Sequence, residues 1–107
     1  MIYVFDIDET ICSKVDKGDY ENAHPWFNRI EKINNLYQDG HTIIYQTARG
    51  MGRHNNNPVL AIQDFFTLTK NQLEEWGAMH HYLFLGKPTG DYYVDDKGVN
   101  ANVFFKE

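Results

Sequence analysis

Acidic, hydroxyl and ammonium side chains follow short apolar runs at several points of this 107-residue sequence. Asp6 and Asp8 come directly after the apolar run 2–5, and Thr47 ends the run that begins at Thr42. Later runs are followed by Lys87, Asp95 and Asp96. Carboxylates about 4 Å apart repel each other by roughly 4 kcal/mol at an intermediate dielectric, so a cation is expected among them. An all-oxygen donor set completed by water suits Mg²⁺.

These residue types together can carry out phosphoryl chemistry. With Mg²⁺ bound, the carboxylate of Asp6 can attack phosphorus, because a metal and a cationic side chain neutralise the phosphoryl oxygens. Lys87 supplies that cation, and the hydroxyl of Thr47 is a donor to a phosphoryl oxygen. Asp8 lies two residues beyond Asp6, close enough to protonate the leaving oxygen and later to deprotonate the attacking water.

Apolar patterning predicts the elements that must position these residues. Pro25 suits the first turn of a helix whose apolar face repeats at spacings of three and four, and Gly40 ends it. A second helix of the same periodicity follows Pro58 and runs to Trp76. The polar stretch 10–24 predicts a flap or short hairpin. Strands are expected at residues 2–5, 42–47, 82–85, 92–94 and 103–105.

Strands that alternate with helices indicate right-handed crossovers and a mainly parallel sheet. We therefore expect an α/β fold, a three-layer Rossmann-like sandwich with helices on both faces of the sheet. The mass of 12.6 kDa corresponds to one domain, residues 1–107, with no room for a cap domain. Ligands of such sheets bind beyond the carboxyl ends of the strands. This rule brings the chemical groups to one rim: Asp6, Asp8, Thr47, Lys87, Asp95 and Asp96.

Composition narrows the choice of partners. The formal charge of −5 repels phosphate backbones, so nucleic acid is not an expected partner. No run of eighteen apolar residues occurs, and an acid interrupts the start of the chain before a signal peptide could form, so neither membrane nor secretion is expected. The single cysteine, Cys12, has no partner for a disulfide or zinc site, which favours the cytoplasm. The acidic surroundings are expected to raise the pKa of Cys12 and leave it inert.

Four segments carry a resemblance to a known superfamily. Asp6-Ile7-Asp8-Glu9-Thr10 resembles the D-x-D-x-T signature of the haloacid dehalogenase (HAD) superfamily, and Thr47, Lys87 and the pair Asp95-Asp96 resemble its second, third and fourth motifs in order. The segments 47–52 and 86–97 look like those of small HAD phosphatases of bacterial capsule polysaccharide synthesis. The resemblance covers nearly the whole chain.

The resemblance implies a role for each residue. Asp6 would be nucleophile and metal ligand, and Asp8 would be general acid and base and bind Mg²⁺ through its carbonyl. Thr47 and Lys87 would hold the phosphoryl group, while Asp95 would bind the metal directly and Asp96 through water or as an orienting group. The expected substrate is a small phosphorylated metabolite, such as a sugar or polyol phosphate. Without a cap domain, the flap is the only lid, and further cover would come from a neighbouring protomer in a homo-oligomer.

Several alternatives remain open at this level. Asp95 and Asp96 could form an Asx turn before Gly98. Arg49, with Gly50 beside it, could bind an anionic part of the substrate, or Arg49 could simply lie on the surface. For the whole chain, the alternatives are a receiver-like signalling domain, a regulatory phosphate-binding protein without turnover, and a phosphatase acting on protein or nucleic acid.

Overall fold

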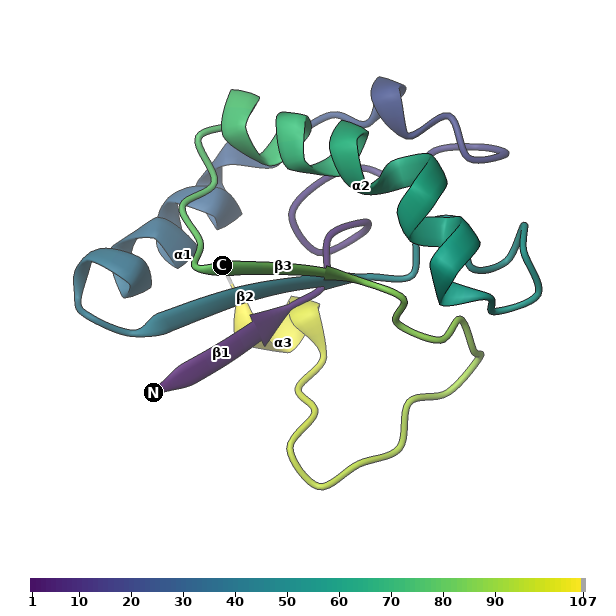
Figure 1. Ribbon diagram of the computed structural model, residues 1–107. Helices are drawn as coiled ribbons and strands as arrows, with labels where there is room; N and C mark the ends of the chain where they lie inside the picture. Colours follow the sequence, from purple (N-terminus) through teal and green to yellow (C-terminus); the bar gives the residue numbers. More distant parts are fainter. Residues whose placement is uncertain (107) are drawn as a thin grey trace.

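The structure is a computed structural model that describes residues 1–106, and three strands and the helices around them form an α/β fold (Figure 1). The strands are parallel and lie in the spatial order β1-β2-β3. This confirms the expected α/β class with a parallel sheet flanked by helices. In chain order, the elements are β1 (Ile2–Phe5), the 3₁₀-helix η1 (Tyr20–Asn22), α1 (Phe27–Gln38), β2 (Thr42–Thr47), α2 (Pro58–Glu75), β3 (Tyr82–Leu85) and α3 (Ala101–Phe104).

The core lies on one face of the sheet. Residues that face this side pair in register across the strands, as Phe5 does with Tyr45. Helix α1 contributes Ile30 and Ile33 to the same buried cluster, and α2 contributes Leu73. Both βαβ crossovers step in the same direction, and right-handed units of this kind place their helices on one face. The expectation of helices on both faces is therefore not met by α1 and α2.

The opposite face of the sheet is apolar and exposed. On β1, Ile2 and Val4 are 70% and 55% exposed, and on β3, Tyr82 and Phe84 are similarly open. Alternation explains the pattern, because successive side chains of a strand point to opposite faces. Helix α3 does not cover this face, since Phe104 packs against Tyr3 and Phe5 on the core side. A parallel sheet is usually covered on both faces, so this one has an unpartnered side.

Two of the five expected strands are wrong. Residues 92–94 form no strand but belong to an extended segment that stands away from the body (Figure 1). Residues 103 and 104 belong to α3, and Phe105 is its C-cap. The side chain of Asn100 caps that helix by accepting from the backbone N–H of Asn102. The apolar residues 103–105 have the β propensity of a strand, and this local cap overrides it.

The polar stretch 10–24 folds back over the loop that follows β2. Its base is closed by antiparallel backbone contacts, in which Ser13 N–H donates to His24 O and Trp26 N–H donates to Ile11 O. Between these contacts the chain makes turns and the helix η1. The aromatic ring of Tyr20 packs edge-on against Phe65 of α2, with centroids 4.9 Å apart. The flap therefore rests on the protein through η1.

Helix α2 has the clearest start signal of the chain. Asn57 accepts hydrogen bonds from the backbone N–H groups of Val59 and Leu60, and Pro58 occupies the first turn. An Asn side chain satisfies amides that have no partner within the helix, and proline has no N–H to leave unsatisfied there. None of the helices within residues 1–106 is both long enough and apolar enough to cross a membrane.

We predict that Asn57→Ala lowers the free energy of unfolding by about 1 kcal/mol, because two helix amides lose their acceptor. Urea denaturation measures the change. Asn57→Ser is the matched control, since its hydroxyl keeps an acceptor at the cap, and it should retain most of the stability. Equal losses in both variants would contradict the assignment of the cap.

Candidate active site

Asp6 and Lys87, separated by 81 positions in the sequence, meet at the carboxyl end of the sheet. Lys87 Nζ lies 3.2 Å from Asp6 Oδ2. The other oxygen of Asp6 accepts a hydrogen bond from the backbone N–H of Ile7 at 2.8 Å, which fixes the orientation of the carboxylate. The Asp6 side chain is 39% exposed and that of Lys87 is 17% exposed, so solutes can reach the pair.

Thr47 ends β2 beside this pair, but it is buried. Its backbone carbonyl accepts from the N–H of Lys87, which ties the ends of β2 and β3 together. Its hydroxyl oxygen accepts from the backbone N–H of Arg49 at 3.1 Å. With a residue exposure of 1%, Thr47 reaches a bound phosphoryl group only if the surrounding loop shifts.

Arg49 is fully buried, and the N–H groups of its guanidinium donate to acceptors within the protein. Nε and Nη2 donate to the two oxygens of Asp8, each at 3.0 Å, in a bidentate ion pair. Nη1 donates to Thr69 and Gln72 of α2, and Nη2 also approaches Cys12 Sγ. All five guanidinium N–H groups thus have protein acceptors. Arg49 neither lies on the surface nor has an N–H available for a substrate anion.

The flap joins this network through Tyr20, a residue that the sequence analysis missed. The guanidinium of Arg49 lies 4.7 Å from the centroid of the Tyr20 ring. Gln72 Nε2 donates to the carbonyl of Tyr20 at 2.6 Å. The available signal was the presence of Thr69 and Gln72, two polar residues three apart that face the core from α2. Buried polar side chains need partners, and here the partners are Arg49 and Tyr20.

Gly50, an expected substrate-binding residue, lies at the wall of a small cavity under the flap. Its φ of +81° and the 2.6 Å from an added Cβ to the Phe65 ring require glycine at this position. Its N–H donates to the hydroxyl of Tyr20 at 3.3 Å. The cavity has a volume of about 300 Å³. Its lining consists of Lys17, Gly18, Tyr20, Gly50, Gly52, Arg53 and Phe65.

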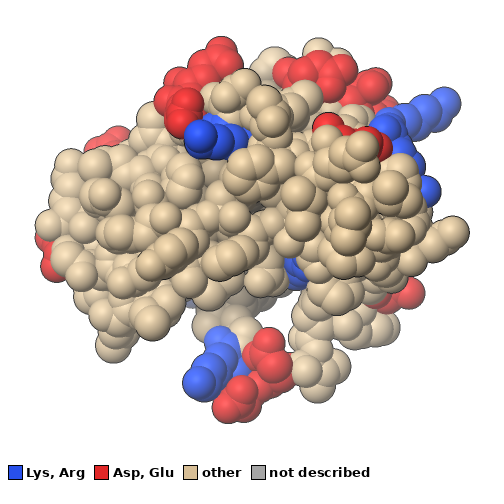
Figure 2. Space-filling view, in the orientation of Figure 1, with Lys and Arg blue, Asp and Glu red and all other residues tan. Residues whose placement is uncertain are grey.

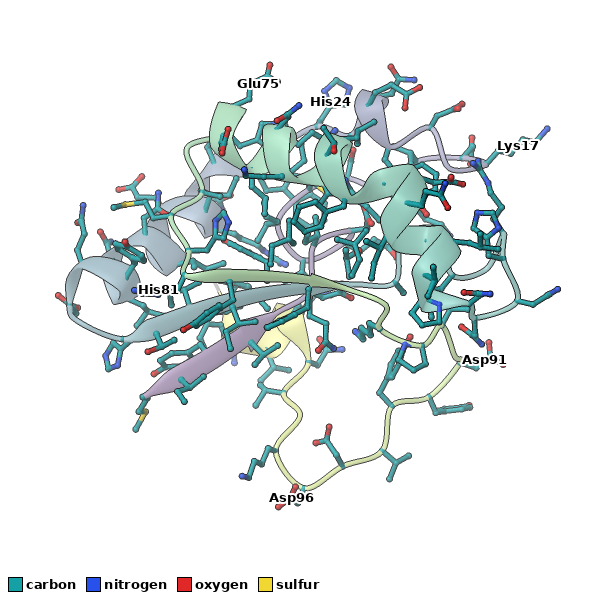
Figure 3. All side chains as sticks on the ribbon, viewed as in Figure 1. Lys17, His24, Glu75, His81, Asp91 and Asp96 are labelled. Carbon is teal, nitrogen blue, oxygen red and sulfur yellow. The ribbon has the colours of Figure 1, made fainter. Side chains whose placement is uncertain are left out.

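The structure does not bring Asp95 and Asp96 to the other predicted site residues. Both lie in the exposed segment after β3, and Asp96 is at its outermost point (Figure 3). Asp95 Oδ1 accepts from the backbone N–H groups of Lys97 and Gly98, which lowers the pKa of Asp95 below its ordinary value. These hydrogen bonds form an Asx turn at Asp95, which is the alternative that the sequence analysis left open for this pair. In the space-filling view, acidic and basic side chains gather at the tip of this segment, below the body (Figure 2).

The carboxylates in this arrangement do not fit a magnesium site. Within residues 1–106, no three His, Cys, Asp or Glu side chains gather closely enough to hold a metal ion. Both oxygens of Asp8 are bound by Arg49, and one oxygen of Asp6 is bound by Lys87. The predicted set Asp6, Asp8, Asp95 and Asp96 is therefore dispersed, because the segment carrying the last two residues does not pair with β1.

Cys12 is buried beneath the same network. Burial raises the pKa of its thiol from 9.0 to about 12, and the charge of Asp8 adds to the shift. The direction agrees with the expectation of an inert thiol. The main cause differs, because desolvation of the thiolate outweighs the acidic surroundings.

We predict that Arg49→Met lowers the free energy of unfolding by about 3 kcal/mol, because Asp8, Thr69 and Gln72 lose their partner in a mostly buried network. Urea denaturation of the wild-type protein and of each variant measures the free energy of unfolding. Arg53→Met is the control, since Arg53 is exposed, and its effect should stay within about 0.5 kcal/mol. A loss for Arg49→Met no larger than the control would contradict the structural role of the network.

We predict that Cys12 does not react with a thiol reagent at pH 8 in the folded protein and reacts fully in urea. The raised pKa also has a consequence for stability. Above pH 9 the unfolded thiol loses its proton while the folded one keeps it, so the free energy of unfolding falls as pH rises from 9 to about 12. In Cys12→Ala this part of the alkaline decline should be absent. Rapid labelling of the native protein at pH 8 would contradict the assignment.

The fold has a counterpart among solved structures. The chain is similar to the crystal structure of a target protein from Vibrio cholerae, with a TM-score of 0.86 and 24% sequence identity over 96% of this chain and 85% of that chain. At this identity, the similarity establishes the fold. No family model matches the sequence, and no curated protein matches it.

Proposed function

We propose that this protein is a phosphomonoester hydrolase of the HAD type that uses Asp6 as its nucleophile. The observation that carries the proposal is the contact between Asp6 and Lys87 at 3.2 Å, at the edge of the sheet where parallel α/β proteins bind ligands. A carboxylate beside an ammonium group is suited to phosphoryl transfer, because the ammonium offsets the charge of the incoming phosphoryl oxygens.

The orientation of Asp6 supports its role as nucleophile. The hydrogen bond from Ile7 N–H holds Oδ1, so that Oδ2 is the oxygen directed to Lys87. In the proposed reaction, Oδ2 forms a bond to phosphorus and the ester oxygen leaves with a proton. Water then cleaves the aspartyl phosphate and releases inorganic phosphate. The ammonium of Lys87 accompanies the phosphoryl oxygens through both steps.

Asp8 cannot take part in proton transfer while Arg49 holds it. Each of its oxygens accepts a hydrogen bond from the guanidinium, which leaves neither oxygen placed to carry a proton. Its proposed work as general acid and base therefore requires Arg49 to release at least one oxygen. Until then, solvent is the proton source for the leaving group.

The surroundings of the site favour a small substrate. The cavity beside Gly50 has a volume of about 300 Å³, at the lower end of the range for small-molecule sites. It contains the cationic residues Lys17 and Arg53 and no acidic residue. A polar or anionic part of a phosphorylated sugar or polyol matches this lining, and Asp6 and Lys87 lie outside it.

We predict that phosphate release from a panel of sugar and polyol phosphates is reduced on the order of 10³-fold or more by Asp6→Asn and about 10²-fold by Lys87→Met, because the nucleophile and its cation are lost. A colorimetric phosphate assay, run with and without Mg²⁺, measures both effects. The controls are Asp39→Asn and Lys70→Met, two exposed residues whose replacement should leave turnover unchanged.

Undiminished turnover in Asp6→Asn, or no turnover of any compound with Mg²⁺ present, would remove the hydrolase proposal. Labelling with acetyl phosphate adds a second readout. A phosphoprotein that persists for hours would indicate a receiver-like domain, whereas hydrolysis predicts a transient one.

A further inference from the structure

The segment between β3 and α3 exposes side chains that are suited to a strand. Tyr92 and Val94 are 89% and 93% exposed, although aromatic and β-branched residues favour a sheet. The segment is extended, lies outside the body of the protein and ends in the Asx turn of Asp95 (Figures 1 and 3). It has the composition of a strand and no strand to pair with.

One edge of strand β1 has no partner strand. The strand pairs with β2 along one edge, and no backbone hydrogen bond joins its other edge to any residue in the range 1–106. The side chains of Ile2 and Val4 on its open face are exposed as well. An unpaired edge with apolar side chains is a template for an added strand.

We propose that two copies of this chain exchange these segments, so that residues 92–94 of each copy add as a parallel strand to the free edge of β1 in the other. Each molecule both offers a strand and lacks one, and a two-fold axis satisfies both copies at once. If Val94 lies beside Phe5, Asp95 and Asp96 follow at the level of Asp6. The inference rests on the proposed function in one respect: the exchange would bring Asp95 and Asp96 to the site at Asp6.

The outward conformation of the segment favours pairing with β1 of a second copy over pairing with β1 of its own chain. The segment is held outward by its own contacts, in which the hydroxyl of Tyr93 donates to Pro88 O at 2.7 Å and accepts from Gly90 N–H at 3.1 Å. Lys87 Nζ also lies 4.3 Å from the centroid of the Tyr93 ring. Closure within one chain must break these contacts, whereas a second copy can meet the segment where it stands. Exchange of an extended element is a low-cost route to a dimer.

Cross-linking tests which chain supplies the strand. The register above also places Asp91 beside Ile2, so a variant with Ile2→Cys and Asp91→Cys is treated with a short bismaleimide. This pair leaves Tyr93 and its contacts in place. Both positions are exposed and the native Cys12 is buried, so the variant should fold and react only at the new thiols. Exchange predicts a product of twice the chain mass, several-fold above the control pair Ile2→Cys with Val59→Cys. A product of single-chain mass, or no excess over the control, would overturn the exchange.

Sedimentation velocity tests the dimer without reference to activity. The wild-type chain should sediment as a dimer, and Val94→Asp should weaken the association by at least about tenfold, because a charge is placed in the added strand. Val59→Asp introduces the same charge at another exposed valine, on α2, and should leave the dimer intact. A wild-type monomer, or equal weakening by both variants, would also overturn the exchange.

Complementation separates this inference from the proposed function. Asp6→Asn and Asp95→Asn are co-expressed, so that half of the dimers contain one chain of each kind. One of the two sites in such a dimer then has both native carboxylates, which predicts about one quarter of wild-type activity. Recovery supports exchange, while an inactive mixture of chains that still cross-link as dimers leaves the exchange standing and removes the role of Asp95 in hydrolysis. Recovery is not expected from closure within one chain.

Discussion

The buried guanidinium of Arg49 is the contact on which the candidate site depends. Arg49 belongs to the loop after β2, and its guanidinium contacts three other parts of the chain. These are the loop after β1 through Asp8, the flap through Tyr20, and α2 through Thr69 and Gln72. A charge without solvent must be matched by acceptors of fixed geometry. The loops at the carboxyl end of the sheet are therefore fixed relative to one another by one side chain.

This arrangement divides the two aspartates of the first loop into different roles. Asp8 faces inward and neutralises Arg49, whereas Asp6 faces the solvent and Lys87. Their separation by a single residue, the buried Ile7, accounts for the divergence. The three residues 6–8 after β1 thus supply both a partner for the buried Arg49 and a carboxylate that is accessible at the surface.

Local pattern accounts for much of the fold. The strands β1, β2 and β3 and the two long helices follow from apolar periodicity and from caps such as Asn57 and Pro58. The residues 92–94 have the composition of a strand but need a neighbouring edge, which local sequence does not specify. The burial of Arg49 could not be predicted from its own position, because a buried arginine and an exposed one look the same in the sequence. The available signal lay elsewhere, in the polar residues Thr69 and Gln72 on the core face of α2. In the site, the meeting of Asp6 and Lys87 follows from the parallel topology, while the placement of Asp95 depends on whether its segment pairs.

The open edge of β1 has a consequence for how the protein is made. Backbone groups of an unpaired edge do not distinguish one extended polypeptide from another, so the first chain encountered during synthesis matters. Ribosomes translating one messenger release identical chains near each other, which raises the local concentration of the partner that the proposed exchange needs. Dense translation from a single transcript would therefore favour that exchange, and sparse translation would leave the edge open to foreign chains.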